Sequence, residues 1–157
     1  NYTTSVAEEV QLAKSYITIQ QYRYQKRADF AVEVYGALET YQMPSMVLQP
    51  LIENSLKHGM SDMPGCTLIV RARQEGYNIV LSVEDDGLGI PPEKLKKLQE
   101  MLRDDSNIMV KKSRYGIGLR NTNRRIKLLY GSDYGLTIES EVEERTCVTI
   151  TFPKHRP

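Results

Sequence analysis

The stretch VEDDGLGIPP, residues 83–92, ends an apolar strand in two adjacent acids and two glycines. The strand begins upstream, because Ile79, Leu81 and Val83 alternate with other side chains, as in a strand that buries one face. A second run, CTLIVRAR (66–73), alternates in the same way. The turn QEGY between the two runs favours a hairpin. These residues therefore predict the centre of a sheet with one buried face.

The rest of the chain predicts helices and further strands that would complete one α+β domain. An apolar stripe with spacings of four and three residues, and a capping box of Ser5 and Glu8, predict the first helix. Pro50 places the regular start of the second helix near Leu48, because proline is tolerated in a first turn. The predicted helices are 6–26, 48–59, 91–102 and 118–130, and the other predicted strands are 30–36, 135–142 and 145–152. We expect a two-layer α/β sandwich whose mixed or antiparallel sheet is covered on one face by helices.

The composition is ordinary for a globular protein, with 157 residues of which 40% are hydrophobic and 26% are charged. The 21 Lys and Arg residues nearly balance the 20 Asp and Glu residues, so the net charge of +1 gives no general attraction to nucleic acid or acidic membranes. Cys66 and Cys147 lie in strand-like runs without metal-ligand spacing, which favours reduced core residues of a cytosolic domain. No apolar stretch approaches the ~18 residues of a membrane span, so we expect no signal peptide and any membrane anchor outside this sequence.

The two acids before the glycines have three candidate explanations. A calcium loop of the EF-hand type needs oxygen ligands at alternating positions and a bidentate glutamate at the twelfth. Counting from Asp85, the twelfth residue is Lys96, and Leu88 and Ile90 are apolar, so calcium is excluded. A tight turn at a strand end needs only the local preferences of Asp and Gly. The motif alone leaves that explanation and a nucleotide site equally open.

Two further segments favour the nucleotide site. ENSLKHG (53–59) would place Asn54, Lys57 and His58 on one helical face through spacings of three and four. YGIGLRN (115–121) places two glycines directly before a helix, where free backbone N–H groups and the helix dipole favour an anion. Each segment is a weak signal alone, and their order along the chain makes them specific.

In this order, LIENSLKHG, DDGLGI and YGIGL resemble the N, G1 and G2 boxes of the GHKL nucleotide-binding superfamily, which includes histidine kinases, type II topoisomerase ATPase subunits, Hsp90 and MutL proteins. MPSMVLQPLIENSLKHG and GIGLRNTNRRIKLLYG are similar to the LytS/YesM-type branch of bacterial sensor histidine kinases, and the resemblance covers residues 6–153. It implies the Bergerat (GHKL) fold, with ATP and Mg²⁺ as cofactors. Residues 1–28 would be a helix linking to a dimerisation and phosphoacceptor region, and residues 29–157 the ATP-binding catalytic domain.

The resemblance assigns the adenine to the first glycine box. Asp85 would accept a hydrogen bond from the adenine amino group and disfavour guanine, which presents a carbonyl there, because an ionised carboxylate only accepts. Gly87 and Gly89 would let the backbone pass the base, and Ile90 would offer it an apolar face. Thr146 matches a threonine behind the adenine, although an arginine precedes it where the family usually has a glycine.

The metal and the phosphates would meet the other two boxes. Asn54 would be the magnesium ligand, because a neutral amide oxygen suits a hard ion whose charge the triphosphate already balances. Lys57 would reach phosphate as a point charge. His58 would either touch phosphate or bond a carbonyl at the helix end, and both alternatives stay open. Residues 103–115 would form a lid. The remaining candidates for phosphate contact are Gly116, Ile117, Gly118 and Leu119 at the second glycine box and Lys111, Lys112 and Arg114 in the lid.

We therefore expect the ATP-binding catalytic domain of a two-component sensor histidine kinase, which positions Mg-ATP for phosphoryl transfer to a histidine outside this sequence. No catalytic residue is expected within the chain, because His58 belongs to the N box and His155 lies in the tail. The implied partners are its own dimerisation and phosphoacceptor domain, which would make the full-length protein a homodimer, and a response regulator, with no nucleic acid. The implied location is cytoplasmic, as a domain of a membrane-anchored bacterial protein.

Two other functions remain as alternatives. A GHKL-type ATPase or an anti-sigma-factor serine kinase typically carries a glutamate four residues before the magnesium-binding asparagine. Pro50 occupies that position, and Glu53 points about 100° away around the helix. The third function is a nucleotide-binding interaction module without catalysis. The intact Asn54, Asp85 and glycine boxes argue against a degenerate pocket of that kind.

Overall fold

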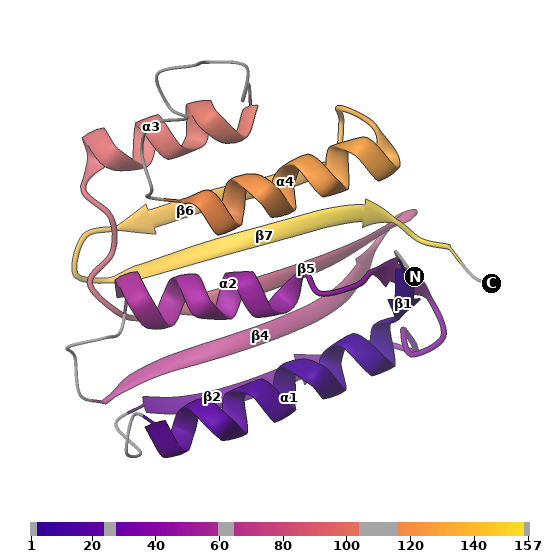
Figure 1. Cartoon of the computed structure of the whole chain (residues 1–157), viewed down its shortest axis with the longest axis horizontal. Coiled ribbons are helices and arrows are strands. Elements are labelled where there is room, and N and C mark those ends of the chain that lie inside the picture. Colours follow the sequence, from indigo (N-terminus) through magenta and orange to yellow (C-terminus); the bar gives the residue numbers. More distant parts are fainter. Residues whose placement is uncertain (1–2, 24–27, 60–64, 104–115, 156–157) are drawn as a thin grey trace.

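The computed structural model describes residues 3–23, 28–59, 65–103 and 116–155, and its centre is a five-stranded sheet (Figure 1). The strand order is β2-β4-β5-β7-β6. The strands are β2 (Ala28–Val34), β4 (Cys66–Glu75), β5 (Asn78–Asp85), β6 (Gly135–Glu141) and β7 (Arg145–Pro153). β2 runs parallel to β4, whereas the other neighbours are antiparallel, so the sheet is mixed.

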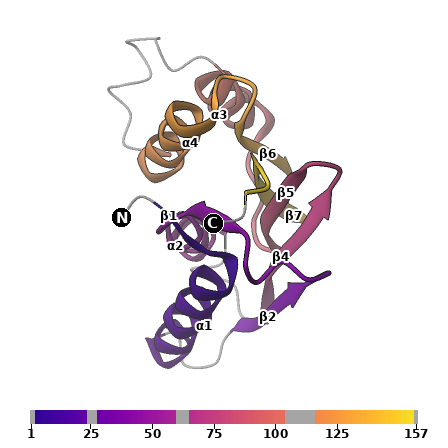
Figure 2. The same cartoon turned by 90° about the vertical axis from the view of Figure 1, so that its right-hand side faces the viewer.

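The helices lie on one face of this sheet, which Figure 2 shows from its edge. They are α1 (Val6–Arg23), α2 (Leu48–Asn54), the π-helix η1 (Ser55–Gly59), α3 (Pro92–Arg103) and α4 (Ile117–Tyr130). The opposite face carries charged pairs, in which Glu84 contacts Arg71 at 2.7 Å and Arg145 at 2.9 Å. The predicted two-layer sandwich is confirmed.

Rows of inward side chains cross the sheet because neighbouring strands pair in register. In two such rows every member is apolar and buried. These rows are Val70–Val83–Val148–Ile138 and Ala72–Leu81–Ile150–Leu136, in the order β4, β5, β7, β6. The alternation predicted for β4 and β5 is therefore confirmed, and their hairpin turns at Gly76, whose φ is 61°.

α1 forms as its apolar stripe predicts and packs into the same core as the sheet. The buried apolar members of its stripe are Val6, Val10, Ala13 and Ile17. Ser5 Oγ accepts the backbone N–H of Glu8 at 3.1 Å, which confirms one half of the predicted capping box. The Glu8 carboxylate accepts the hydroxyl of Thr4. None of the described helices is long and apolar enough to cross a membrane.

A small second sheet was not predicted from the sequence. β1 (Thr3–Ser5) pairs antiparallel with β3 (Gln42–Pro44), and each strand has three residues, too few for an alternating pattern to be recognised. The pairing sets Ser5 opposite Gln42. It therefore brings the start of α1 beside the segment that leads into α2 (Figure 1).

The second predicted helix needs a correction. The α-helix begins at Leu48 as expected, but it ends at Asn54 and continues as the π-helix η1. A π-helix bonds each N–H to the carbonyl five residues back, so its turns are wider than those of an α-helix. The predicted face of Asn54, Lys57 and His58 therefore runs from α2 into η1, where the spacing of an α-helix no longer applies.

Candidate functional site

A third inward row of the sheet has three polar side chains, whereas its two neighbours are entirely apolar. Register places Leu68, Asp85, Thr146 and Ser140 side by side across β4, β5, β7 and β6. Asp85 is 1% exposed and Thr146 is 4% exposed. A carboxylate is almost never buried without a partner, because burial removes its hydration. The row therefore marks this end of the sheet as the candidate site.

Asp85 is held by the glycine turn that follows it. Its Oδ1 accepts the backbone N–H of Gly87 at 3.0 Å. Within the described part of the chain, its Oδ2 and the hydroxyl of Ser55 are both buried and have no hydrogen-bond partner. Burial raises the pKa of the Asp85 carboxyl, and the nearby Ser55 hydroxyl and the Gly87 N–H oppose the rise. Because the Ser55 contact does not meet hydrogen-bond geometry, Oδ2 has capacity to accept a further donor.

Gly89 has a structural role that the sequence analysis did not give. Its φ is 71°, and a Cβ atom there would lie 2.2 Å from the backbone oxygen of Glu141, at the end of β6. In the same contact, the carbonyl of Leu88 accepts the N–H of Glu143 at 2.6 Å. The close contact between Gly89 and the β6–β7 hairpin is by itself sufficient reason for a glycine at this position. That Gly89 also makes room for the base stays a prediction.

Ser140, which sequence reasoning missed, ties the first glycine box to the β6–β7 hairpin. Its hydroxyl accepts the N–H of Ile90 at 2.8 Å and donates to the carbonyl of Arg145 at 2.7 Å. Since that hydroxyl has one proton, the Thr146 hydroxyl is the donor in their 2.8 Å contact. The inward alternation of β6 was the sequence signal that could have found Ser140.

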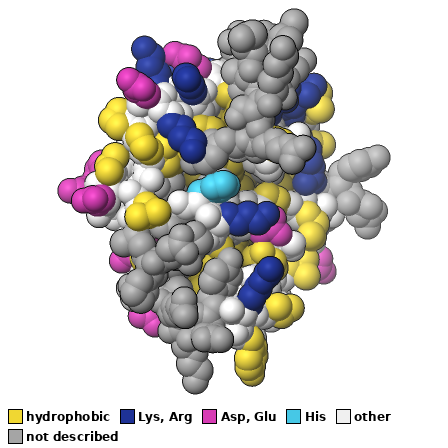
Figure 3. All heavy atoms as spheres, turned by 60° about the vertical axis from the view of Figure 1, so that its left-hand side comes forward, with side chains coloured by type: hydrophobic (Ala, Val, Ile, Leu, Met, Phe, Trp, Pro, Cys, Tyr) yellow, Lys and Arg dark blue, Asp and Glu magenta, His cyan; other side chains and the backbone are white. Residues whose placement is uncertain are grey.

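The N-box side chains lie where α2 passes into η1. Asn54 is half-buried at the end of α2, and Lys57 and His58 are exposed. Partial burial of the ring lowers the pKa of His58, and the positive charges of Lys94 and Lys57 lower it further. Figure 3 shows this charge on the surface, where a histidine side chain lies among Lys and Arg side chains. Lys94, in the first turn of α3, was also missed, because a lysine in a charged helix is ordinarily solvated.

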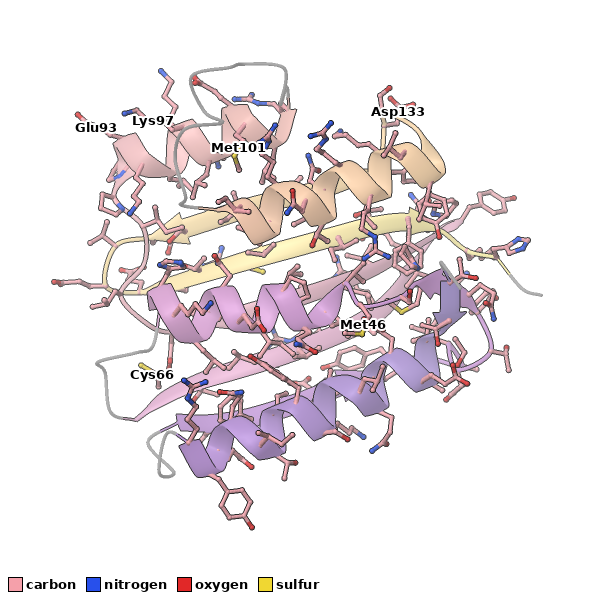
Figure 4. All side chains as sticks on the ribbon, in the orientation of Figure 1. Met46, Cys66, Glu93, Lys97, Met101 and Asp133 are labelled. Carbon is pink, nitrogen blue, oxygen red and sulfur yellow. The ribbon has the colours of Figure 1, made fainter. Side chains whose placement is uncertain are left out.

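The second glycine box forms the start of α4. Gly116 is the residue before the helix and has φ of 78°, a left-handed conformation that favours glycine. A Cβ atom there would lie 2.8 Å from Leu98 Cδ2 and 3.3 Å from Met101 Cε, both on α3. Figure 4 labels Met101 on this helix. Gly116 therefore lets the chain enter α4 directly beneath α3.

The first turn of α4 approaches α2. A Cβ atom on Gly118 would lie 3.9 Å from Pro50 Cβ, which is ordinary contact. Ile117 is exposed and Leu119 is buried, and their contact with phosphate stays a prediction. The first N–H groups of an α-helix have no partner within the helix. The N-terminus of α4 and the Pro50 side of α2 thus lie side by side.

Some predictions fall outside what the described residues can test. Lys111, Lys112 and Arg114 lie in the segment 104–115, outside the described residues, and so does nearly all of the predicted lid. Among the side chains that are described, no three from His, Cys, Asp and Glu gather to hold a metal ion. The roles of these residues, and that of Asn54 toward magnesium, stay predictions.

Solved structures of histidine kinase domains share this fold. The catalytic domain of the histidine kinase ThkA superimposes with a TM-score of 0.66 at 16% identity, over 97% of this chain and 94% of that chain. The mycobacterial sensor histidine kinase MprB superimposes with a TM-score of 0.64 at 17% identity, over 99% of this chain and 98% of that chain. The fold is therefore that of GHKL histidine kinase catalytic domains.

The chain belongs to the family of histidine kinase-, DNA gyrase B- and HSP90-like ATPases, whose model matches residues 41–156. Sensor histidine kinase YesM from Bacillus subtilis is 30% identical over 150 residues, covering 95% of this chain and 24% of YesM. Sensor protein LytS from Staphylococcus saprophyticus is 34% identical over 160 residues, covering 99% of this chain and 25% of LytS. The LytS/YesM resemblance is confirmed, and the chain spans about a quarter of the length of these relatives.

Proposed function

We propose that this domain binds Mg-ATP and presents the γ-phosphate to a histidine outside the sequence, as the catalytic domain of a sensor histidine kinase. The buried carboxylate of Asp85 carries the proposal, because its Oδ2 is an acceptor without a partner among the described residues. An adenine amino group is a donor that fits it. Ser55 and Thr146, which border Asp85, complete a polar floor for the base.

The phosphates would lie between η1, α3 and the start of α4. Lys57 and Lys94 give this side of the site its positive charge, and they lie near His58. The unpaired N–H groups at the start of α4 favour an anion as well. Asn54 would hold Mg²⁺ through its amide oxygen, together with the phosphates and water, because a single neutral ligand binds magnesium weakly by itself. The ion would supply neutralisation of the charge on the transferring phosphoryl group.

The site favours transfer to another domain over hydrolysis. Pro50 stands four residues before Asn54, where GHKL ATPases typically carry their base, and its ring lies against the start of α4. Glu53 accepts a hydrogen bond from Gln49 at 3.3 Å. Since proline has no acid or base function, we expect ATP hydrolysis barely above background. We expect no self-labelling, because the acceptor histidine would lie outside this sequence.

The partners would be a dimerisation and phosphoacceptor region of the same protein and a response regulator. Residues 1–28 would link to that region, and Leu12, Ile19 and Tyr22 are exposed on α1 with spacings of seven and three. ThkA, whose fold matches at a TM-score of 0.67 and 14% identity over 98% of this chain and 41% of that chain, has been solved with the response regulator TrrA. We place the domain on the cytoplasmic side of a membrane-anchored protein.

The magnesium dependence of ATP binding tests this proposal. Wild-type protein should bind ATP more tightly with magnesium than without it in titration calorimetry. Asn54→Ala should lose most of that difference and keep its ADP affinity without metal. Asn78→Ala, at the far end of β5, is the control and should behave as wild type. Failure of wild-type protein to bind any adenine nucleotide would contradict the proposal.

A further inference from the structure

A buried glutamate from α1 caps the start of α2. Glu9 is 2% exposed, and its carboxylate accepts three backbone N–H groups from the turn before α2 and its first residue. The bonds run from Met46 to Oε1 at 3.0 Å, and from Val47 and Leu48 to Oε2 at 2.8 and 3.1 Å. The first N–H groups of a helix need such acceptors, and Val47, at the N-cap position, makes no side-chain cap. Glu9 therefore supplies, from a distant part of the sequence, the cap that α2 lacks.

The capped turn is also held from α4 and is conformationally strained. Arg125 donates through Nη2 to the carbonyl of Ser45 at 2.7 Å. Met46 has φ of 58°, in the left-handed region that residues other than glycine seldom adopt. Such a conformation persists when its surroundings hold it. Figure 4 labels Met46 between α2 and α1.

α2 joins this turn to the candidate site. It has seven residues, which span about 10 Å at the α-helical rise, and its far end carries Asn54 and then Ser55. Leu51 and Ile52 are fully buried, so the helix is packed along its length. A helix of two turns packed this tightly moves as a unit, so a shift of its first turn is also a shift of Asn54 and Ser55.

We propose that Glu9 is a positioning residue that couples α1 to nucleotide binding. Its carboxylate fixes the first turn of α2, and through α2 it sets the place of Asn54 and Ser55. This inference rests on the proposed function, because it assumes that those two residues face Mg-ATP. A displacement of α1 that withdraws Glu9 would weaken Mg-ATP binding, so α1 is a route by which the rest of a sensor protein reaches the site.

Glu9→Gln in the full chain tests the coupling, because glutamine keeps the shape but directs an NH₂ group at backbone donors. Glu8→Gln is the matched control, since Glu8 is the neighbouring exposed acid and its carboxylate accepts the Thr4 hydroxyl at the start of α1. Calorimetry should show Mg-ATP binding weakened roughly fivefold or more in Glu9→Gln, in the range of ordinary coupling between sites, and unchanged in Glu8→Gln. Hydrogen exchange at Met46, Val47 and Leu48 should be faster in Glu9→Gln.

Two readouts separate positioning from mere stabilisation. In wild-type protein, Mg-ATP should slow exchange at Val47 and Leu48, because coupling is reciprocal, and Glu9→Gln should lose this protection. Adding Met46→Gly to Glu9→Gln relieves the strain of the left-handed backbone at residue 46. The double variant should therefore regain part of the Mg-ATP affinity and part of the stability. Unchanged Mg-ATP affinity in folded Glu9→Gln, or no rescue in the double variant, would overturn this inference alone. Absence of nucleotide binding in wild-type protein would instead overturn the proposed function and this inference with it.

Discussion

Asp85→Asn is the substitution whose effects the structure specifies most fully. Asp85 Oδ1 already accepts the N–H of Gly87, so the amide oxygen of asparagine would keep that contact and its NH₂ would replace Oδ2. The amino group of adenine would then face another donor. Leaving a buried donor unmet costs about 1–3 kcal/mol. At ~1.4 kcal/mol per tenfold, ADP and ATP should bind roughly five- to 150-fold more weakly.

The same substitution should not lower stability, which separates lost recognition from unfolding. Burial raises the pKa of Asp85 above its unfolded value, so the charged form opposes folding at neutral pH. That penalty is absent below the unfolded pKa and grows as the pH rises through the folded one. A neutral asparagine removes it but places a buried NH₂ group where Oδ2 was, so the free energy of unfolding at neutral pH should stay close to that of wild type.

Titration calorimetry with ADP, ATP and GTP, together with thermal denaturation, checks both expectations. Asp86→Asn is the control, because Asp86 is exposed and its Oδ1 accepts the N–H of Thr67 at 2.6 Å, away from the polar row. Asp85→Asn should also reduce the preference for adenine over guanine, since guanine presents an acceptor to the new NH₂. Unchanged adenine nucleotide affinity in folded Asp85→Asn would refute the assignment of this pocket.

Three further outcomes are expected. Because the pKa of Asp85 is raised, ADP affinity in wild-type protein should fall as the pH is lowered through that value, and titrations from neutral to acidic pH should show a flatter profile in Asp85→Asn. ADP should raise the pKa of His58, since phosphate charge opposes the nearby lysines; an NMR titration of its ring that shows no change would place the phosphates elsewhere. Gly89→Ala should lower the melting temperature even without nucleotide, because its Cβ would lie 2.2 Å from the backbone oxygen of Glu141. Gly118→Ala should keep the melting temperature of the wild type and weaken the binding of Mg-ATP.

The fold was predictable where the signal is local. Alternation along β4 and β5 identified the buried face of the sheet. Asp85 continues the alternation of Ile79, Leu81 and Val83 at the end of β5. The acids and glycines of residues 85–89, in the expected order with the segments 53–59 and 115–121, then favoured a nucleotide site over a tight turn. These features depend on neighbouring residues, so one sequence is enough to recognise them.

The remaining features depend on contacts between distant segments. Glu9 meets Met46 and Leu48 at separations of 37 and 39 residues, and an acid in a first helical turn gives no sign of a partner so far away. The change from α2 to η1 has no marker in ENSLKHG, although it decides which way Asn54 and its neighbours face. The sequence analysis assigned Gly89 to the base because it could not show the contact with Glu141. Only in the folded structure does the β6–β7 hairpin lie so close that a Cβ atom at Gly89 would clash with the Glu141 backbone.

Incubation with γ-labelled ATP and a separately supplied domain that carries the family's acceptor histidine tests the central claim most directly. The account predicts that label moves to that domain, slowly because the tether is missing, and that the chain neither labels itself nor releases phosphate much above background. At ATP concentrations below saturation, Asp85→Asn and Asn54→Ala should strongly reduce the transfer. Vigorous phosphate release by the wild-type chain alone, lost in Asn54→Ala and without any transfer to the acceptor domain, would contradict the account and make the protein an ATPase.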